Sequence, residues 1–114
     1  MRSKIIALSN NNEFKFLLKK NKISNHYVTI FFGNLKNKDI KKLNISFVVK
    51  KKISNAVNKN KIKRRLRKII NDAVKKISIK FNYSYLVIAK PSMLNSEYTN
   101  IKETLFQSFK KINK

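Results

Sequence analysis

Basic residues are concentrated in one short stretch of the sequence. Between Lys50 and Lys68, ten of the nineteen residues are Lys or Arg, and none is Asp or Glu. Lysine acts as a point charge toward phosphate, and arginine adds a planar fork of donors that matches phosphate oxygens. Repulsion among so many like charges opposes the compact state unless a polyanion neutralises them. The stretch therefore predicts a surface that binds nucleic acid.

A solvated helix face is the ordinary explanation for a run of like charges. Surface helices normally mix the two signs, because Glu and Lys four positions apart stabilise a helix by roughly 0.2 to 0.5 kcal/mol and like pairs destabilise it by similar amounts. Between Asp39 and Asp72 the sequence has twelve Lys or Arg residues and no acid. Bound phosphates would restore the stability that such a run gives up, so we interpret it as a binding surface.

The candidate contact residues lie mainly on a helix that the spacing predicts from about Asn55 onward. At about 100° per residue, the cations cover both sides of an apolar stripe, so one flank can face a sheet while the other meets a second surface. Asn60 is neutral among the cations and can both donate and accept hydrogen bonds, which suits a specific polar contact. The residues expected to bind RNA are Lys51, Lys52, Lys59, Asn60, Lys61, Lys63, Arg64, Arg67 and Lys68.

Side chains for hydrolytic chemistry are not grouped in the sequence. Metal-dependent nucleases usually hold their cations with clustered carboxylates, and His26, the only histidine, cannot supply both the acid and the base of a metal-independent ribonuclease. The single glycine, Gly33, cannot build a phosphate-binding loop. We therefore expect no catalytic residue and no metal site in the polypeptide itself. The five acids are scattered, at Glu13, Asp39, Asp72, Glu97 and Glu103.

The composition predicts one small folded domain. The chain has 114 residues, of which 42% are hydrophobic, and its formal net charge is +23. This length is typical of a single domain, so residues 1–114 are assigned to one RNA-binding domain. The absence of cysteine excludes disulfides. There is no apolar run of about 18 residues that could span a membrane and no signal peptide, so we expect a cytoplasmic protein that does not bind a membrane.

Hydrophobic periodicity predicts six elements in an α+β arrangement. The first two strands, joined by about ten polar residues, predict a hairpin. The long helix between the second and third strands makes a β-α-β unit, whose strands should be parallel. The third strand is apolar throughout, as expected for a central strand covered on both faces. The expected order is helix (10–20), strand (26–32), strand (44–49), helix (from 55), strand (85–89) and helix (from 96).

The basic segment closely resembles the signature of the bacterial ribonuclease P protein subunit. That signature has two lysines, a turn of small residues, Asn-Ala-Val, Arg-Asn-Arg, a branched apolar residue, Lys-Arg, and a further Arg three positions on. The chain follows this pattern from Lys51 to Arg67. The resemblance covers nearly the whole chain, including Glu13-Phe14, the aromatic first strand, the segment from Tyr85 to Pro91 and the C-terminal amphipathic helix.

The chain departs from the family pattern at four positions. Lys59 and Lys61 replace the two arginines that flank the asparagine, so the charge is kept while the bidentate, stacking geometry of arginine is lost. Ser54 replaces a usual glycine, and Leu18 stands where many members have a second phenylalanine. These changes affect the fine geometry of contacts rather than the resemblance itself.

The resemblance implies a single-domain α-β sandwich with a left-handed β-α-β crossover, an exception to the right-handed rule. It also implies that the catalyst is a partner RNA, which removes the 5′ leader of precursor tRNA and holds most of the catalytic Mg²⁺. The protein is then expected to bind this RNA through its basic helix and the single-stranded leader in a cleft lined by Phe14, Ile30 and Phe32. Stacking on aromatic rings tolerates any base. No obligatory protein partner is expected.

Two other classes of protein share parts of this pattern. A small structural ribosomal protein, or a generic RNA-binding protein, would be equally basic and could have the same sandwich. A sequence-specific binder of duplex DNA could place the basic helix in a major groove, but no helix-turn-helix or zipper accompanies that helix.

Overall fold

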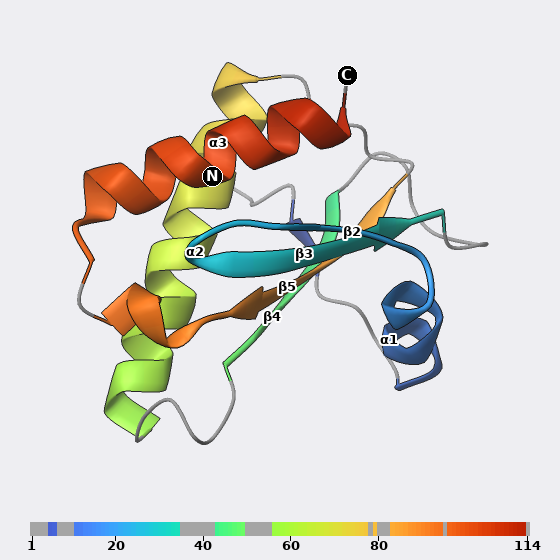
Figure 1. The fold of residues 1–114 in the computed structure, drawn as a ribbon, viewed down its shortest axis with the longest axis horizontal. Coiled ribbons are helices and arrows are strands. Elements are labelled where there is room, and N and C mark those ends of the chain that lie inside the picture. The colour runs from blue at the N-terminus through green and yellow to red at the C-terminus, as the bar shows by residue number, and fades with distance from the viewer. Residues whose placement is uncertain are drawn as a thin grey trace.

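The fold is a five-stranded mixed sheet with helices on both faces, in the strand order β1-β4-β5-β3-β2 (Figure 1). The structure is a computed structural model, which describes residues 5–6, 11–34, 43–49, 56–77, 79, 83–94 and 96–113. The elements are β1 (Ile5–Ile6), α1 (Asn11–Leu18), β2 (Asn21–Ser24), β3 (Val28–Gly33), β4 (Leu43–Val48), α2 (Ala56–Lys76), β5 (Ser84–Ala89), the 3₁₀ helix η1 (Pro91–Leu94) and α3 (Tyr98–Ile112).

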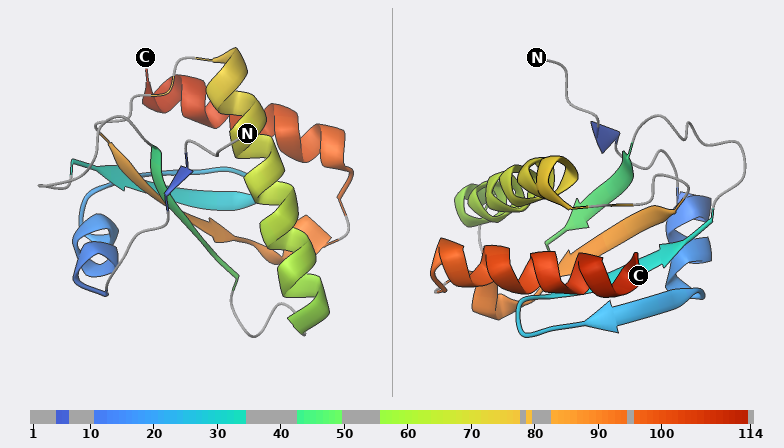
Figure 2. Two further views of the ribbon diagram at one scale, coloured as in Figure 1. Left: turned by 180° about the vertical axis from the view of Figure 1, so that it is seen from behind. Right: turned by 90° about the horizontal axis from the view of Figure 1, so that it is seen from above.

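The predicted β-α-β unit is confirmed. Strands β4 and β5 are parallel neighbours, with Ile45 opposite Tyr85 and Phe47 opposite Val87, and α2 connects them. Taken together, the views in Figures 1 and 2 show that this crossover is left-handed, as the resemblance implied. Strand β5 lies in the middle of the sheet, and five of its six residues are buried, as its uninterrupted apolar sequence predicted.

The hairpin predicted between the strands at 26–32 and 44–49, which correspond to β3 and β4, is wrong. Strand β5 lies between β3 and β4, and β3 is antiparallel to β5. The hairpin partner of β3 is instead β2, a four-residue strand whose sequence Asn-Lys-Ile-Ser lacks the apolar alternation by which strands are recognised. The two-residue strand β1, parallel to β4, was also not predicted.

The helices divide the molecule into three layers. Helices α2 and α3 cover one face of the sheet, and the short α1 lies on the other (Figure 2). The large core lies between the sheet and the α2–α3 layer, where Leu66, Tyr85 and Phe109 are completely buried. On the other face, Leu17 of α1 packs with Leu86 in a much smaller cluster.

Gly33, the only glycine, is the last residue of β3 and lies close to Leu17 and Lys20 at the end of α1. A Cβ atom at this position would be 3.2 Å from Cβ of Lys20 and 3.6 Å from Cδ2 of Leu17. The missing side chain therefore permits the close approach of the end of α1 to the sheet.

Candidate nucleic-acid interface

Helix α2 holds the basic side chains in place by burying its apolar stripe. Ile62 is 1% exposed, and Leu66, Ile69 and Ala73 are 0% exposed, all in the core against the sheet and α3. The intervening cations are thus fixed on the solvent side of a rigid element. Lys61, Lys63, Arg64, Arg67 and Lys68 are all exposed, as expected of a binding surface.

One flank of α2 forms an open groove of about 470 Å³, which we call the Arg67 groove. It is lined by Val57, Asn60, Lys63, Arg64 and Arg67. Val57 is 73% exposed, which is unusual for a valine and places an apolar surface beside three cations. Such a surface can take the phosphates of a nucleic-acid strand on the cations and a sugar or base on the valine.

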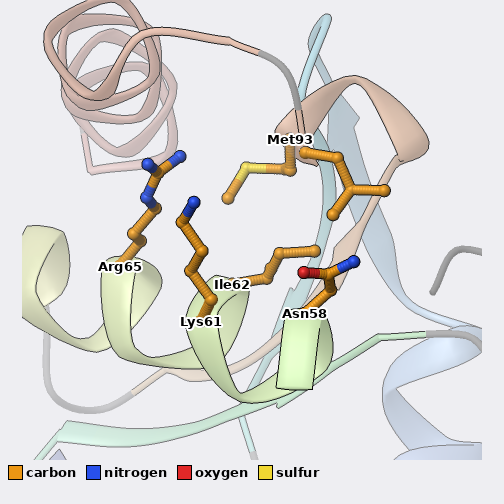
Figure 3. Close-up of a pocket in the computed structure, with 6 residues that line it drawn as sticks. Asn58, Lys61, Ile62, Arg65 and Met93 are labelled. Atoms are coloured by element: carbon orange, nitrogen blue, oxygen red, sulfur yellow. The ribbon is translucent and has the colours of Figure 1, made fainter. Parts of the chain in front are cut away.

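The other flank of α2 forms a smaller pocket of about 170 Å³ with the 3₁₀ helix η1, which we call the Arg65 pocket. It is lined by Asn58, Lys61, Ile62, Arg65, Met93 and Leu94. In Figure 3, Lys61 and Arg65 extend from successive turns of α2 toward the level of Met93. Arg65 is not among the contact residues expected from the sequence, because the family signature does not specify that position, although it continues the charge of Lys61 and Lys68 around the helix.

Helix α3 contacts the C-terminal half of α2 through two pairs of side chains. Lys68 Nζ lies 5.3 Å from the centroid of the Tyr98 ring, a cation–π contact. Lys102 Nζ donates a hydrogen bond to Asp72 Oδ2 at 3.0 Å. This hydrogen bond is the main reason that the pKa of Asp72 is lowered, while burial raises the pKa of Tyr98.

The structure thus separates the predicted contact residues into several places. Asn60, Lys63, Arg64 and Arg67 share the Arg67 groove, and Lys61 lies in the Arg65 pocket. Lys68 packs on Tyr98, and Lys59 is half-buried. Lys51 and Lys52 lie outside the described residues.

The predicted cleft of Phe14, Ile30 and Phe32 is not one surface. Ile30 is 0% exposed in the core beneath α2 and α3, so its assignment to an open cleft is wrong. Phe32 packs against the same core and meets Tyr83 edge to face, with ring centroids 5.7 Å apart. Both therefore lie on the face of the sheet opposite α1, the helix to which Phe14 belongs. The side chain of Phe14 lies outside the described part of the chain.

The alternation of β3 explains this correction. Even-numbered residues of the strand face α2 and α3, whereas Phe31 faces α1. On that side Phe31, Val48 and Ile88 are each half-buried around Leu17 and Leu86. Because α1 has only eight residues, it covers part of this face. We call the half-buried set of Phe31, Val48 and Ile88 the open sheet face.

The turn between β2 and β3 is held by polar contacts to the end of β5 and to α3. Lys90 Nζ donates hydrogen bonds to Ser24 Oγ at 2.7 Å and to the Asn25 carbonyl at 2.5 Å. Asn25 Nδ2 donates to Ser108 Oγ at 2.8 Å. The backbone carbonyl of His26 accepts a hydrogen bond from Ser92 Oγ at 2.6 Å, and the imidazole ring of His26 packs edge-on to the Tyr27 ring. His26 thus has structural contacts in this turn.

Neither a metal site nor a membrane span is found in the part of the chain that the structure describes. No three His, Cys, Asp or Glu side chains come together there as possible metal ligands. None of the helices described is both long and apolar enough to cross a bilayer.

Comparison with known proteins decides the family. The family model described as Ribonuclease P matches residues 3–113. The ribonuclease P protein component of Carboxydothermus hydrogenoformans is 34% identical over 107 residues, which cover 90% of this chain and 87% of the relative. That of Mesoplasma florum is 31% identical, with 86% of each covered. The chain belongs to the bacterial ribonuclease P protein family.

Solved structures of this family have the same fold. The ribonuclease P protein of Staphylococcus aureus is 28% identical with a TM-score of 0.77, covering 95% of this chain and 94% of that one. The protein of Thermotoga maritima, at 21% identity, matches with a TM-score of 0.78 over 93% of this chain and 96% of its own. Family membership favours a ribonuclease P subunit, which acts with an RNA in tRNA processing, over the ribosomal and duplex-DNA alternatives.

Proposed function

We propose that this ribonuclease P protein binds the catalytic RNA and the single-stranded 5′ leader of precursor tRNA, and assists the RNA-catalysed, Mg²⁺-dependent endonucleolytic removal of that leader in the cytoplasm. The observation that carries the proposal is the exposed surface of α2 from Val57 to Lys68, which has cations and no acid and lines both the Arg67 groove and the Arg65 pocket. Neither lining includes an acid. Phosphate groups are the ligands that such a surface favours, and each one neutralised adds to the salt dependence of binding.

The leader is proposed to lie on the open sheet face instead of beside Ile30 and Phe32. Phe31 presents an aromatic ring there, with Val48 and Ile88 as apolar neighbours. A base that stacks on such a ring gains roughly 1 to 3 kcal/mol with little dependence on its identity. This suits a subunit that must accept leaders of many sequences, and Phe14 remains a proposed contact at the same side.

The protein is proposed to contribute binding and not the bond-breaking groups. The acids are spread over separate elements: Asp72 lies on α2, Glu97 just before α3 and Glu103 within α3, and Asp72 is engaged with Lys102. We therefore propose that the catalytic Mg²⁺ is held mainly by the partner RNA. The chain's role toward the metal is then indirect, through the positioning of RNA phosphates.

Leader recognition can be tested by comparing two substrates. The complex of this protein with a bacterial ribonuclease P RNA is titrated with a precursor tRNA that has a leader of five to ten nucleotides and with the same tRNA without one. We expect the protein to tighten binding of the first substrate and to leave binding of the second nearly unchanged. Equal tightening of both would contradict leader recognition and favour a generic RNA-binding role.

A further inference from the structure

The Arg65 pocket faces a different direction from the Arg67 groove. At 100° per residue, the direction of Lys61 and Arg65 differs from the mean direction of the groove residues by about 120° around α2. One wall of the pocket comes from η1, through Met93 and Leu94, so the pocket depends on the tertiary fold and not on the helix alone. A group bound there is separate from one bound in the Arg67 groove.

Arg65 is a charged side chain without a partner of opposite charge among the described residues. It is half-buried, and it makes no ion pair or hydrogen bond with any other residue in the described ranges. Its neighbour one turn earlier, Lys61, has the same charge and lines the same pocket. Partial removal of a cation from water is unfavourable unless an anion compensates for it. The pocket therefore has the electrostatic character of an anion site.

The lining of the pocket favours a phosphate group over a base. Its volume of about 170 Å³ admits a phosphate group. The apolar floor is closed to solvent, since Ile62 is 1% and Met93 0% exposed, so a flat ring has little surface on which to stack. The polar groups that line the pocket are the cationic ends of Lys61 and Arg65 and the side-chain amide of Asn58 (Figure 3).

We propose that the Arg65 pocket binds one backbone phosphate of an RNA segment, distinct from the segment in the Arg67 groove, so that α2 contacts RNA on two flanks. This inference rests on the proposed function, because it assumes an RNA ligand. The family signature does not specify the position of Arg65 between its Lys-Arg pair and the Arg three positions on. The second flank thus combines Lys61, at a position of the signature, with Arg65, at a position outside it.

The test uses the salt dependence of RNA binding. The dissociation constant is measured from 50 to 400 mM KCl for a ribonuclease P RNA alone and for a leader-bearing precursor tRNA alone. A lost phosphate contact lowers the slope of log K against log salt by about 0.7 for a single strand and about 0.9 for a duplex. We expect Arg65→Gln to lower the slope by this amount with one of the two RNAs, which identifies the source of the phosphate.

Three further variants complete the design. Lys75→Gln removes an equal charge from an exposed position of α2 that lines neither site, and should leave the slope unchanged. Arg67→Gln combined with Arg65→Gln should lower the slope by about the sum of the two single changes, because the sites are separate. Lys61→Gln, at an exposed side chain of the same pocket, should reproduce the effect if Arg65→Gln unfolds the protein.

The outcomes separate this inference from the proposed function. The phosphate site would be overturned if Arg65→Gln and Lys61→Gln had the wild-type slope with both RNAs. If Arg67→Gln still lowered the slope in that case, the proposed function would remain intact. A slope change as large in Lys75→Gln would show a general effect of net charge and would also overturn the site. A wild-type protein that binds neither RNA would remove the proposed function itself.

Discussion

Leu66 and Arg67 are neighbours in the chain, but their side chains leave α2 in directions about 100° apart, one into the core and the other into solvent. Leu66 is 0% exposed in the core beneath the helix, whereas Arg67 is exposed and lines the Arg67 groove. The two positions thus separate the stability of the fold from the binding of RNA. A substitution at each should affect one property and spare the other.

Leu66→Ala is expected to lower the free energy of unfolding by roughly 2 to 5 kcal/mol, because it removes buried methyl groups and leaves a cavity. Urea denaturation measures this loss. Leu66→Met, which nearly conserves the volume, is the matched control and should cost less than about 1.5 kcal/mol. A loss below 1 kcal/mol for the alanine variant would mean that the packing of α2 on the sheet is looser than the structure shows.

Arg67→Gln is expected to weaken binding to ribonuclease P RNA or precursor tRNA about tenfold or more. A hydrogen bond to a charged group contributes about 1.5 to 3 kcal/mol, and 1.4 kcal/mol corresponds to a factor of ten. The midpoint of thermal unfolding should stay within a degree or two, because the side chain is exposed. If stability fell and affinity did not, Arg67 would have a structural role instead.

Phe31→Leu and Phe32→Leu form a matched pair on the two faces of β3. Phe31 faces α1 and Phe32 faces the core under α2 and α3. We expect Phe31→Leu to weaken binding of precursor tRNA with a leader, relative to the same tRNA without one, by roughly 1 kcal/mol or more. Phe32→Leu should lower stability without changing this difference. If instead Phe32→Leu weakened leader-dependent binding and Phe31→Leu did not, the leader cleft expected from the sequence, with Phe32 in its lining, would be supported.

The ion pair between Asp72 and Lys102 is expected to stabilise the fold only above acid pH. The hydrogen bond from Lys102 lowers the pKa of Asp72 below its ordinary value of 3.8. A carboxyl group whose pKa is lower in the folded state stabilises it above the unfolded pKa, and this stabilisation disappears as the pH falls through the folded pKa. Thermal midpoints of the wild type and Asp72→Asn should therefore differ at pH 6 and approach each other as the pH falls below 3.8 through the lowered pKa of Asp72.

The stabilisation of the fold by the Asp72–Lys102 ion pair should also decrease as the salt concentration rises. The two side chains are 29% and 26% exposed, so added ions screen their attraction. Lys102→Met is the reciprocal variant and should show the same convergence at low pH. A difference between Asp72→Asn and the wild type that does not diminish as the pH is lowered through the pKa of Asp72 would mean that the amide perturbs packing, and that the pair itself contributes little.

The helices and the central strand were predictable because their signals are local. The stripe from Ile62 to Ala73 repeats with the period of a helix and is buried as expected. The apolar run of β5 predicted a central strand, and the β-α-β connection predicted its parallel pairing with β4. The exposure of Asn60, Lys63, Arg64 and Arg67 followed from their places off the stripe.

The pairing of β3 and the face of its residues were not predictable in the same way. Val28, Ile30 and Phe32 alternate with Thr29 and Phe31, and both sets are apolar enough to be buried. Only the packing of α1 on one side and α2 and α3 on the other decides which set enters the core. Likewise, the Arg65 pocket needs η1 as a wall, and Met93 comes about thirty residues after the cations that line the pocket with it.

Cleavage of precursor tRNA in a reconstituted system tests the central claim most directly, namely that this chain assists an RNA catalyst and performs no cleavage itself. Rates are compared at about 2 mM and 20 mM Mg²⁺ for a bacterial ribonuclease P RNA alone, for the protein alone and for the two together. We expect no cleavage by the protein alone, and a rate for the complex well above that of the RNA alone at the lower Mg²⁺ concentration. Cleavage by RNA-free protein, or no rise in rate on adding the protein at low Mg²⁺, would contradict the account.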